Sequence, residues 1–298
     1  MISLEKMLKN NNKKIKSKSP VGSNTSWGNV ADWYDDTIER EGRYQRDLIL
    51  PNLIRLVAVK SGEKIIDIAC GQGFFTREMA KARASVTGVD ISSELIKIAR
   101  ERSGSNLSPS KRGRSRGGAT PLLFSPLNRG EGEPSVNYIV APADKLPLKD
   151  GEFDKAIIVL ALQDIENLSG VIGEASRVLK LGGEFFIVIN HPTFRIPKRT
   201  AWLYDEKRKI QSRVVDEYMS EARVKMEVRP GADKSILTNY FHRPLQTYFK
   251  AFQKAGFTVT RLEEWVSAKQ SEPGPRAQAE NKARREFPMF MAIVAKKN

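Results

Sequence analysis

The chain has 298 residues, of which 40% are hydrophobic, and its formal net charge at pH 7 is +15. That length can bury the core of one elaborated domain or two, and no apolar run approaches the ~20 residues of a membrane span. The one cysteine, Cys70, excludes an intramolecular disulfide framework, and with two histidines it offers too few donors for a zinc site of those ligands. The N-terminal lysines lack the apolar segment of a secretory signal. We therefore expect a cytoplasmic protein.

The positive charge is unevenly distributed along the chain. Residues 1–25 carry six lysines against one glutamate, and residues 102–135 carry six basic groups against two acidic ones. Residues 195–298 carry 22 basic and 12 acidic groups, and the remainder carries 16 and 20. That remainder is therefore mildly acidic, whereas a nucleic-acid enzyme more often has a basic stripe around its pocket. Charge alone does not predict a nucleic-acid partner.

The first elements precede the presumed sheet. Residues 1–25 are rich in lysine, asparagine and serine without a sustained period, which predicts a disordered tail. An anionic-surface contact is the alternative role for that tail. From Trp27 a helical stretch that contains Tyr34 runs to about Leu50, and a second helix follows over residues 52–59.

A strand, a glycine turn and a helix start follow. Residues 64–68 are β-branched and apolar, which is typical of a buried parallel strand. Gly71 and Gly73 then let the backbone approach a ligand closely. This combination builds a nucleotide pocket at the carboxyl end of a sheet. A dinucleotide fingerprint needs a third glycine, but that position is Thr76, so NAD is disfavoured.

A second strand over residues 85–89 is closed by Asp90, and a helix runs from Ser93 to about Arg102. Asp90 lies 23 residues past Asp67, close to the ~20 of a βαβ unit in which a carboxylate accepts ribose hydroxyls. A helix cap is the alternative role for Asp90, although the serines that follow can cap this helix.

Residues 103–135 interrupt the fold with a run rich in glycine, serine, proline and arginine. An inert surface insertion is the favoured interpretation, and an RNA-binding arginine tract is the alternative. Residues 26–298 otherwise form one domain, in which residues 191–243 are expected to add a mostly helical cap. A helix then runs from Tyr240 through Lys254.

Five further strands complete the expected sheet. The third and fourth, over residues 136–140 and 155–160, are followed by a helix and a fifth strand over residues 184–190. Strands over residues 258–264 and 289–295 then close the chain as an antiparallel pair.

Three motifs carry a family resemblance. Asp67-Ile-Ala69-Cys-Gly71-Gln-Gly73 resembles the Asp-x-Gly-x-Gly-x-Gly motif of class I S-adenosylmethionine-dependent methyltransferases, with Ala69 in place of the first glycine. The Ala-Asp, Leu-Pro and Gly-x-Phe-Asp pattern over residues 143–154 is also similar to this family, as is Arg-Val-Leu-Lys-x-Gly-Gly over residues 177–183. The resemblance covers residues 27–101, 136–192 and 240–296.

The resemblance implies a fold and a cofactor. The fold is a Rossmann-like α/β arrangement, with a seven-stranded, mostly parallel sheet, an antiparallel edge strand and helices on both faces. The cofactor is S-adenosylmethionine, and Asp144 accepts from its adenine amino group. The implied cofactor-binding residues are Asp67, Ala69, Gly71, Gly73, Asp90, Ile91, Ala143, Asp144 and Leu160.

The resemblance also implies a methyltransferase of the type 11-like group, which acts on small molecules, with an in-line displacement as its reaction. A small-molecule acceptor is therefore the expected partner. Two alternatives stay open: methylation of RNA or protein, and cofactor binding without catalysis. The sequence identifies neither the acceptor nor the methylated atom.

The expected catalytic residues are His191, His242 and Tyr34. Both histidines are expected beside the acceptor, His191 after the fifth strand and His242 at the start of a helix. Imidazole can take a proton at neutral pH, while Tyr34 belongs to the aromatic lid that such enzymes place over cofactor and substrate. The structural alternatives are a turn cap for His191, packing within the cap for His242, and core packing for Tyr34.

Overall fold

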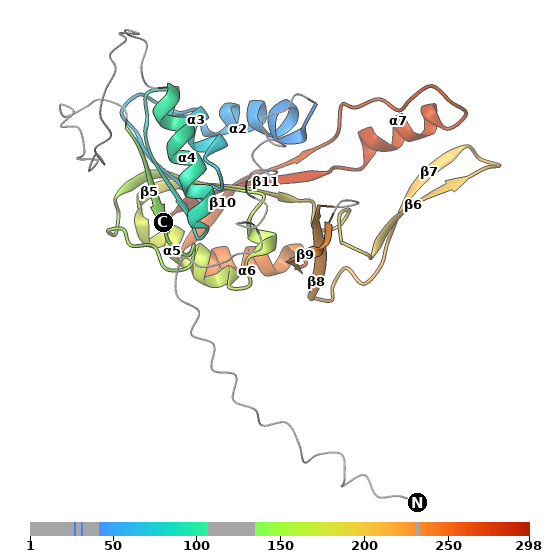
Figure 1. Ribbon diagram of the computed structural model, residues 1–298. Helices are drawn as coiled ribbons and strands as arrows, with labels where there is room; N and C mark the ends of the chain where they lie inside the picture. The colour runs from blue at the N-terminus through green and yellow to red at the C-terminus, as the bar shows by residue number, and fades with distance from the viewer. Residues whose placement is uncertain (1–26, 28–30, 32–41, 107–134, 230–232) are drawn as a thin grey trace, which may run out of the picture.

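The computed structural model of the chain describes residues 27, 31, 42–106, 135–229 and 233–298. A seven-stranded sheet lies at its centre, with the strand order β10-β11-β5-β4-β1-β2-β3 (Figure 1). The strands are β1 (Lys64–Ile68), β2 (Ser85–Asp90), β3 (Val136–Val140), β4 (Phe153–Val159), β5 (Leu179–Asn190), β10 (Phe257–Trp265) and β11 (Phe290–Lys297).

The sheet is mostly parallel, as the sequence predicts. β1 pairs in parallel with β2 and β4, and the outer neighbours β3 and β5 continue that direction. β11 is antiparallel to both β5 and β10, so the antiparallel pair closes one side of the sheet, with β10 outermost. Every parallel strand therefore ends at the same edge, where a ligand site is expected.

Helices cover both faces of the sheet. Ile66 and Ile68 of β1 belong to a buried cluster with residues of two helices on one face, whereas Ile65 belongs to a cluster with helices of the other face. This alternation follows from the two-residue period of a strand. The first face carries α5 (Leu168–Val178) and α6 (Leu245–Lys254); the second carries η3 (Gln45–Ile49), α2 (Leu50–Val57) and α3 (Phe74–Ala80), with α4 (Ser93–Asn106) against β3.

The helix before the low-complexity run is longer than predicted. α4 continues to Asn106, and Ser103 is buried in its last turns, where its Oγ lies 2.9 Å from the Tyr138 hydroxyl. This side-chain hydrogen bond explains why a serine that resembles the start of a linker belongs to the helix. Residues 1–25, predicted as a tail, and residues 107–134 lie outside the described residues.

The predicted helical cap is wrong, because residues 191–243 contain two β-hairpins. The first pairs β6 (Thr200–Asp205) with β7 (Ile210–Val215), and the second pairs β8 (Ala222–Arg229) with β9 (Asp233–His242). In β8, apolar and charged residues alternate in the sequence, which is the period of a strand rather than of a helix. The predicted helix start at Tyr240 is wrong for the same reason, since Tyr240 lies in β9 and α6 begins at Leu245.

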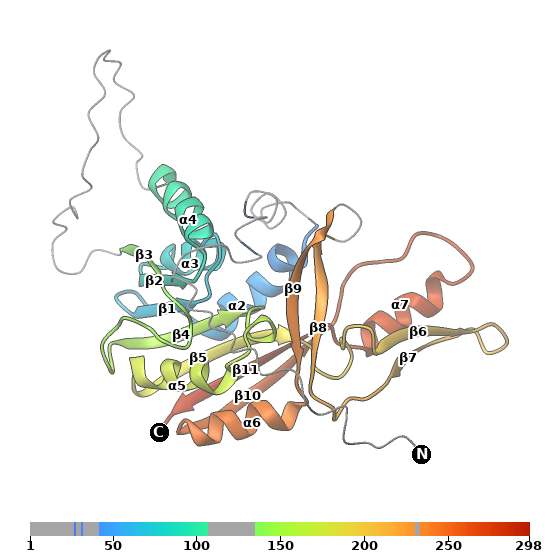
Figure 2. The same ribbon diagram turned by 60° about the horizontal axis from the view of Figure 1, so that its bottom comes forward.

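Both hairpins lie beyond the carboxyl ends of the parallel strands (Figure 2). β9 contacts η4 (Leu162–Asp164), the short turn that follows β4, and α7 (Ala277–Glu286) packs beside β7. None of the helices in the described ranges is both long and apolar enough to cross a bilayer.

Candidate cofactor and acceptor site

The turn after β1 takes three left-handed residues in close succession. Ala69, Gly71 and Gly73 have φ values of 57°, 57° and 78°, and Gly73 is the N-terminal cap of α3. Left-handed backbone costs a non-glycine residue roughly 1–2 kcal/mol, so Ala69 is strained where the related motif has glycine. The Gly71 N–H donates to Asp90 Oδ2 at 2.8 Å, which joins the turn to the end of β2.

Asp67 supports this turn from below. Its carboxylate is buried, and Oδ2 accepts a hydrogen bond of 2.6 Å from the Thr76 hydroxyl of α3. Burial raises the pKa of Asp67 to about 7, against the opposing effect of the Thr76 hydrogen bond. Thr76, the residue that disfavours a dinucleotide, is thus the partner that joins β1 to α3. Gln72, in the same turn, has a buried amide nitrogen without a hydrogen-bond partner among the described residues.

Tyr138 of β3 fills the space beneath the turn, a role that we did not predict from the sequence. A Cβ at Gly73 would lie 2.5 Å from the Tyr138 hydroxyl, and one at Gly88 would lie 2.7 Å from its ring. Such separations are too short for real atoms, so both positions require glycine. Gly88 marks the contact in the sequence, since a glycine inside a strand often allows a neighbour to approach closely.

Asp90 occupies the position predicted for a ribose acceptor. It lines a cavity, and its two carboxylate oxygens already accept the N–H groups of Ser92 and Gly71, each at 2.8 Å. Each carboxylate oxygen can accept more than one hydrogen bond, so Asp90 keeps acceptor capacity for ligand hydroxyls. Burial raises the pKa of Asp90, and the backbone hydrogen bonds act in the opposite direction.

Ala143 and Asp144 lie in the loop after β3 and line the same cavity. Asp144 Oδ2 accepts a hydrogen bond of 2.7 Å from the side-chain amide of Asn167, which also caps α5. No hydrogen bond from the described residues reaches the second carboxylate oxygen, which leaves an acceptor for a ligand amino group.

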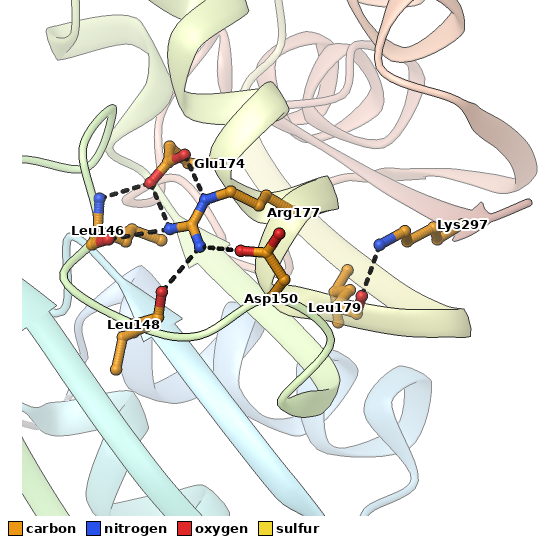
Figure 3. A network of polar contacts seen from close by, with 7 residues as sticks. All are labelled: Leu146, Leu148, Asp150, Glu174, Arg177, Leu179 and Lys297. Atoms are coloured by element: carbon orange, nitrogen blue, oxygen red, sulfur yellow. Dashed lines mark hydrogen bonds and ion pairs between the residues drawn. The ribbon is translucent and has the colours of Figure 1, made fainter.

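Arg177 of α5 holds this loop in place (Figure 3). Its guanidinium donates to the carbonyl oxygens of Leu148 and Leu146, at 2.7 and 2.9 Å. It also pairs with Glu174 and Asp150, and Glu174 in turn accepts the Leu146 N–H at 2.6 Å. Arg177 belongs to the Arg-Val-Leu-Lys-x-Gly-Gly pattern, so that pattern supports the cofactor loop from the neighbouring helix.

These residues surround one cavity of about 380 Å³. Its walls come from the turn after β1, the ends of β2, β3 and β4, and the second hairpin, through Thr238 and Asn239 of β9. The volume lies in the ordinary range for small-molecule sites. Small residues at positions 69, 71 and 143, with acceptors at Asp90 and Asp144, fit an adenosine-containing cofactor.

Asp164 stands on the side of the cavity formed by the end of β4 and the second hairpin. It is the last residue of η4 and lines the cavity, and no hydrogen bond or ion pair reaches its carboxylate from the residues the structure describes. Burial alone raises the pKa of Asp164 to about 8. Perturbed carboxyl groups of this kind concentrate at functional sites. The sequence placed this segment at the end of a central strand, but it gave no reason to select Asp164.

Two buried tyrosines lie near Asp164. Tyr240 of β9 and Tyr248 of α6 both have a raised pKa, mainly through burial, and the charge of Asp164 contributes to each shift. Arg243, which lies between these elements in the chain, donates to the carbonyl oxygens of Leu162, Ile165 and Glu166 at 3.1, 2.7 and 2.7 Å. The second hairpin and α6 are thereby fixed to the turn that carries Asp164.

Residues 66–187 match the model of a family described as a methyltransferase domain. Together with a glycine turn, Asp90 and Asp144 around one cavity, this match identifies the domain. Residues 66–187 form a methyltransferase domain of the S-adenosylmethionine-dependent kind. The cofactor of that family is S-adenosylmethionine, and the residues around the cavity fit it.

Known methyltransferases are similar to this chain over parts of its length. A demethylmenaquinone methyltransferase from Tropheryma whipplei is 29% identical over 139 residues, which are 46% of each chain. A ubiquinone biosynthesis O-methyltransferase from Thiobacillus denitrificans is 25% identical over 160 residues, 53% of this chain and 58% of the relative. The chain therefore spans about half the length of the curated relatives it matches.

A solved methyltransferase structure resembles this chain in fold over a larger part of its length. The crystal structure of an S-adenosylmethionine-dependent methyltransferase from Mesorhizobium loti has a TM-score of 0.58 and 24% identity, and the match covers 83% of this chain and 96% of that chain. This likeness shows that the fold is that of the methyltransferases, which confirms the fold class predicted from the sequence.

The structure does not bring the two histidines of this chain to the cavity. His191 is buried after β5, where its Nδ1 accepts from the N–H groups of Thr193 and Phe194 at 3.2 and 3.4 Å, and its Nε2 lies 2.7 Å from Glu264 Oε1. Burial lowers the pKa of His191 despite that carboxylate. His191 thus caps a turn, which is the non-catalytic role that the sequence analysis gave as the alternative.

His242 is the last residue of β9 and is also buried. Its Nε2 lies 2.8 Å from the carbonyl oxygen of Tyr218, to which it donates. Burial lowers the pKa of His242 as well, and the Tyr218 hydrogen bond opposes this shift. A catalytic role for either histidine stays a prediction. Tyr34, the third expected catalytic residue, lies outside the described residues.

The remaining cofactor predictions fall into two groups. Ile91 and Leu160 line the cavity together with Ala69, Gly71 and Asp90. Leu160 has a φ of 54°, another left-handed non-glycine residue at the edge of the site. Asp67 and Gly73 do not line this cavity and act through the shape of the turn instead.

Proposed function

We propose that this methyltransferase transfers a methyl group to a hydroxyl oxygen of a small molecule bound between Asp164 and β9. The observation that carries the proposal is the Asp164 carboxyl, which has no described partner and lines the same cavity as Asp90 and Asp144. A cofactor-binding protein without catalysis has no need of a half-buried, uncompensated carboxyl group on the acceptor side of its cavity.

The chemistry asks little of the protein beyond alignment and one proton transfer. Bound S-adenosylmethionine supplies a methyl group that is already activated for in-line displacement. With the cofactor bound, the methyl carbon would bond to the acceptor oxygen as its bond to the sulfonium sulfur breaks, and the sulfur would keep the electron pair as a neutral thioether. The hydroxyl proton would pass to the Asp164 carboxylate. A base with a pKa near the working pH is effective in this role, and about 8 for Asp164 meets that condition.

The surrounding residues position the base and exclude water. Arg243 fixes both backbone carbonyls that follow Asp164 and the hairpin that covers it. Tyr240 and Tyr248 are buried beside this side of the site, and the charge of Asp164 acts on both. Holding two reactants in such an enclosure accounts for much of the rate in group transfer.

A hydroxylated ring is the acceptor class that we propose. The two relatives described above are named for demethylmenaquinone and for ubiquinone biosynthesis, and the second is named an O-methyltransferase. The volume of the cavity limits what can bind beside the cofactor. Only a small acceptor, or one whose remainder extends past β9, fits there together with the cofactor. This supports a phenol or hydroquinone rather than a folded macromolecule.

The test is transfer of label from methyl-labelled S-adenosylmethionine to four acceptor pools: simple catechols and hydroquinones, a small-metabolite extract, total RNA and total protein. We expect O-methylated products from the first two pools, and near-complete loss of labelling with Asp164→Asn. Asp47→Asn, at an exposed carboxylate, is the matched control. Labelling of RNA or protein alone would support the first alternative, and tight cofactor binding without labelling of any pool would support the second.

A further inference from the structure

A second cavity, of about 250 Å³, lies beside the first hairpin and shares no lining residue with the cofactor cavity. Its walls come from the segment after β5, from β6 and β7, and from α7 with the residues that follow it. The six residues that define its chemistry are Phe194, Trp202, Phe287, Arg195, Arg213 and Arg284. None of them has a part in the proposed methyl transfer.

Three aromatic rings form one wall of this cavity. Phe287 lies edge-on to Phe194 and to Trp202, with ring centroids 5.4 and 5.5 Å apart. Phe194 in turn lies against the His191 ring at 4.8 Å, so the two hydrogen-bonded ring nitrogens of that histidine fix this wall. Rings held edge-on to one another leave flat faces that a planar apolar ligand can cover.

The same cavity carries positive charge without matching negative charge. Arg195 makes no side-chain hydrogen bond or ion pair to the residues that the structure describes, and it stacks on Phe290 at 5.5 Å. Arg213 lies over Trp202 and donates to the Phe194 carbonyl oxygen and to Thr200 Oγ1, both uncharged acceptors. Burial lowers the pKa of both arginines, and Arg195 contributes to the lowered pKa of Arg213.

The neighbouring carboxylates are occupied elsewhere. Glu264 contacts the far nitrogen of His191, and Glu206 pairs with Arg276 beyond the cavity. Glu280 lies 3.9 Å from Arg284, the one cation of the three that has a carboxylate within ion-pair distance among the described residues. A partly buried guanidinium without an anion is costly, so a bound anion would offset the repulsion between Arg195 and Arg213.

We propose that this second cavity binds a small aromatic carboxylate. A planar carboxylate matches the fork of a guanidinium in two parallel hydrogen bonds, and the aromatic wall accommodates the ring. The volume lies below the usual range for drug-sized ligands, which limits the ligand to about one ring. Inorganic phosphate has the charge but offers nothing to the aromatic wall, so it binds more weakly.

The experiment is calorimetric titration of the full chain with benzoate, benzamide and inorganic phosphate, without cofactor. We expect benzoate to bind at least tenfold more tightly than benzamide, which has the ring without the charge, and more tightly than phosphate. Arg195→Met should weaken benzoate binding at least tenfold. Arg208→Met, at an exposed arginine in the turn between β6 and β7, is the matched control and should leave it unchanged.

Three outcomes would overturn the proposal: no benzoate binding to the wild type at millimolar concentration, equal affinity for benzamide, or unchanged benzoate affinity in folded Arg195→Met. If that variant does not fold by circular dichroism, Arg284→Met provides the same comparison at a less buried position. Because no cofactor is present and Asp164 is untouched, the result is independent of the proposed methyl transfer.

Discussion

Arg243 Nη2 donates to the carbonyl oxygen of Ile165 at 2.7 Å, and this contact joins segments 78 residues apart. The same nitrogen also donates to the Glu166 carbonyl oxygen, and Nη1 donates to Leu162. The buried Arg243 side chain thus holds the second hairpin against the turn after β4, on the acceptor side of the cofactor cavity. A flat guanidinium can contact three carbonyl groups at once, whereas an ammonium group cannot reproduce its fork.

Arg243→Lys should therefore lower turnover more than cofactor affinity. We expect a loss of about 1–3 kcal/mol in the free energy of unfolding, because at least one buried carbonyl loses its donor. Thermal unfolding, a cofactor titration and the rate with a saturating acceptor measure the three quantities separately. Arg261→Lys, at an exposed arginine of β10, is the control. An equal loss of cofactor affinity and turnover would mean that Arg243 supports the whole cavity rather than its acceptor side.

Asp90→Ala should weaken cofactor binding, and Asp144→Ala should do so less strongly. A hydrogen bond to a charged acceptor contributes roughly 1–3 kcal/mol, which corresponds to about 5- to 150-fold in the dissociation constant. Asp90→Ala also removes the acceptor for the Gly71 and Ser92 N–H groups, so the structure adds a loss of stability.

Asp90→Asn separates these two effects, because it keeps one acceptor oxygen while it removes the charge. Calorimetry with S-adenosylmethionine and with its demethylated product checks the affinities. Unchanged affinity in a folded Asp90→Ala would end its assignment to the ribose.

Asp164→Asn should flatten the pH profile of the reaction. In the wild type the rate should rise as pH increases toward about 8, the raised pKa of Asp164, because the ionised carboxylate accepts the proton. The variant should lose roughly 10²–10⁴ in rate at pH 8 with little change in cofactor affinity. Rates between pH 6 and 9 decide this, and a pH profile that persists in the variant would assign the base elsewhere.

The same raised pKa predicts a pH-dependent stability for the protein without cofactor. A carboxyl with a folded pKa of about 8 and an ordinary pKa near 3.8 contributes stability that is fully present below the lower value. That contribution is lost as pH rises from the ordinary pKa through the folded-state pKa. Wild-type stability should therefore fall relative to Asp164→Asn between pH 4 and pH 8, by about 2 kcal/mol once partial solvation is allowed for. Chemical denaturation at both pH values measures the difference.

The sequence predicted the cofactor side of this site better than the acceptor side, for a physical reason. The turn, Asp90 and Asp144 are local: each follows a recognisable strand, and topology alone brings strand ends together. The acceptor side depends on Arg243 and β9, whose contacts with η4 are long-range. The alternation of apolar and charged residues in β8 was available in the sequence. No general rule, however, predicts where a hairpin inserted into a domain packs against it.

Tyr138 and Asp164 show what sequence patterns omit. The packing of Tyr138 against Gly73 and Gly88 joins β3 to β2 and to the turn after β1, so no spacing along the chain encodes it. Asp164 is distinguished by having no partner among the residues that the structure describes, which only the folded surroundings define. The two histidines were selected by residue type, whereas the structure gives each of them backbone partners.

Ala69→Gly should stabilise the protein. Ala69 has a φ of 57°, and glycine adopts this conformation without the steric cost of a Cβ. Relief of roughly 1–2 kcal/mol is reduced by the greater freedom of glycine in the unfolded chain, so a net gain of about 0.5–1 kcal/mol is expected. Ala58→Gly, at another left-handed alanine away from the site, is the comparison. A loss of stability in Ala69→Gly alone would show that the methyl group of Ala69 has a packing role.

The last prediction concerns His191 and His242, the two residues that the sequence favoured as bases. A general base should lose roughly 10²–10⁴ in rate when replaced by alanine, with cofactor affinity unchanged. The geometry supports a different result: His191→Ala removes the acceptor of two backbone N–H groups and the support of Phe194, and His242→Ala removes a donor to Tyr218. We therefore expect each variant to lose about 1–3 kcal/mol of stability and less than tenfold in turnover below its melting temperature.

Both imidazoles have a lowered pKa in the folded state, so the stability they contribute is present above pH 6.5 and is lost as pH falls below it. Turnover and thermal unfolding measured on the same preparations at pH 5.5 and 7.5 separate the two roles. A hundredfold loss of rate in a variant of unchanged stability would return that histidine to the mechanism.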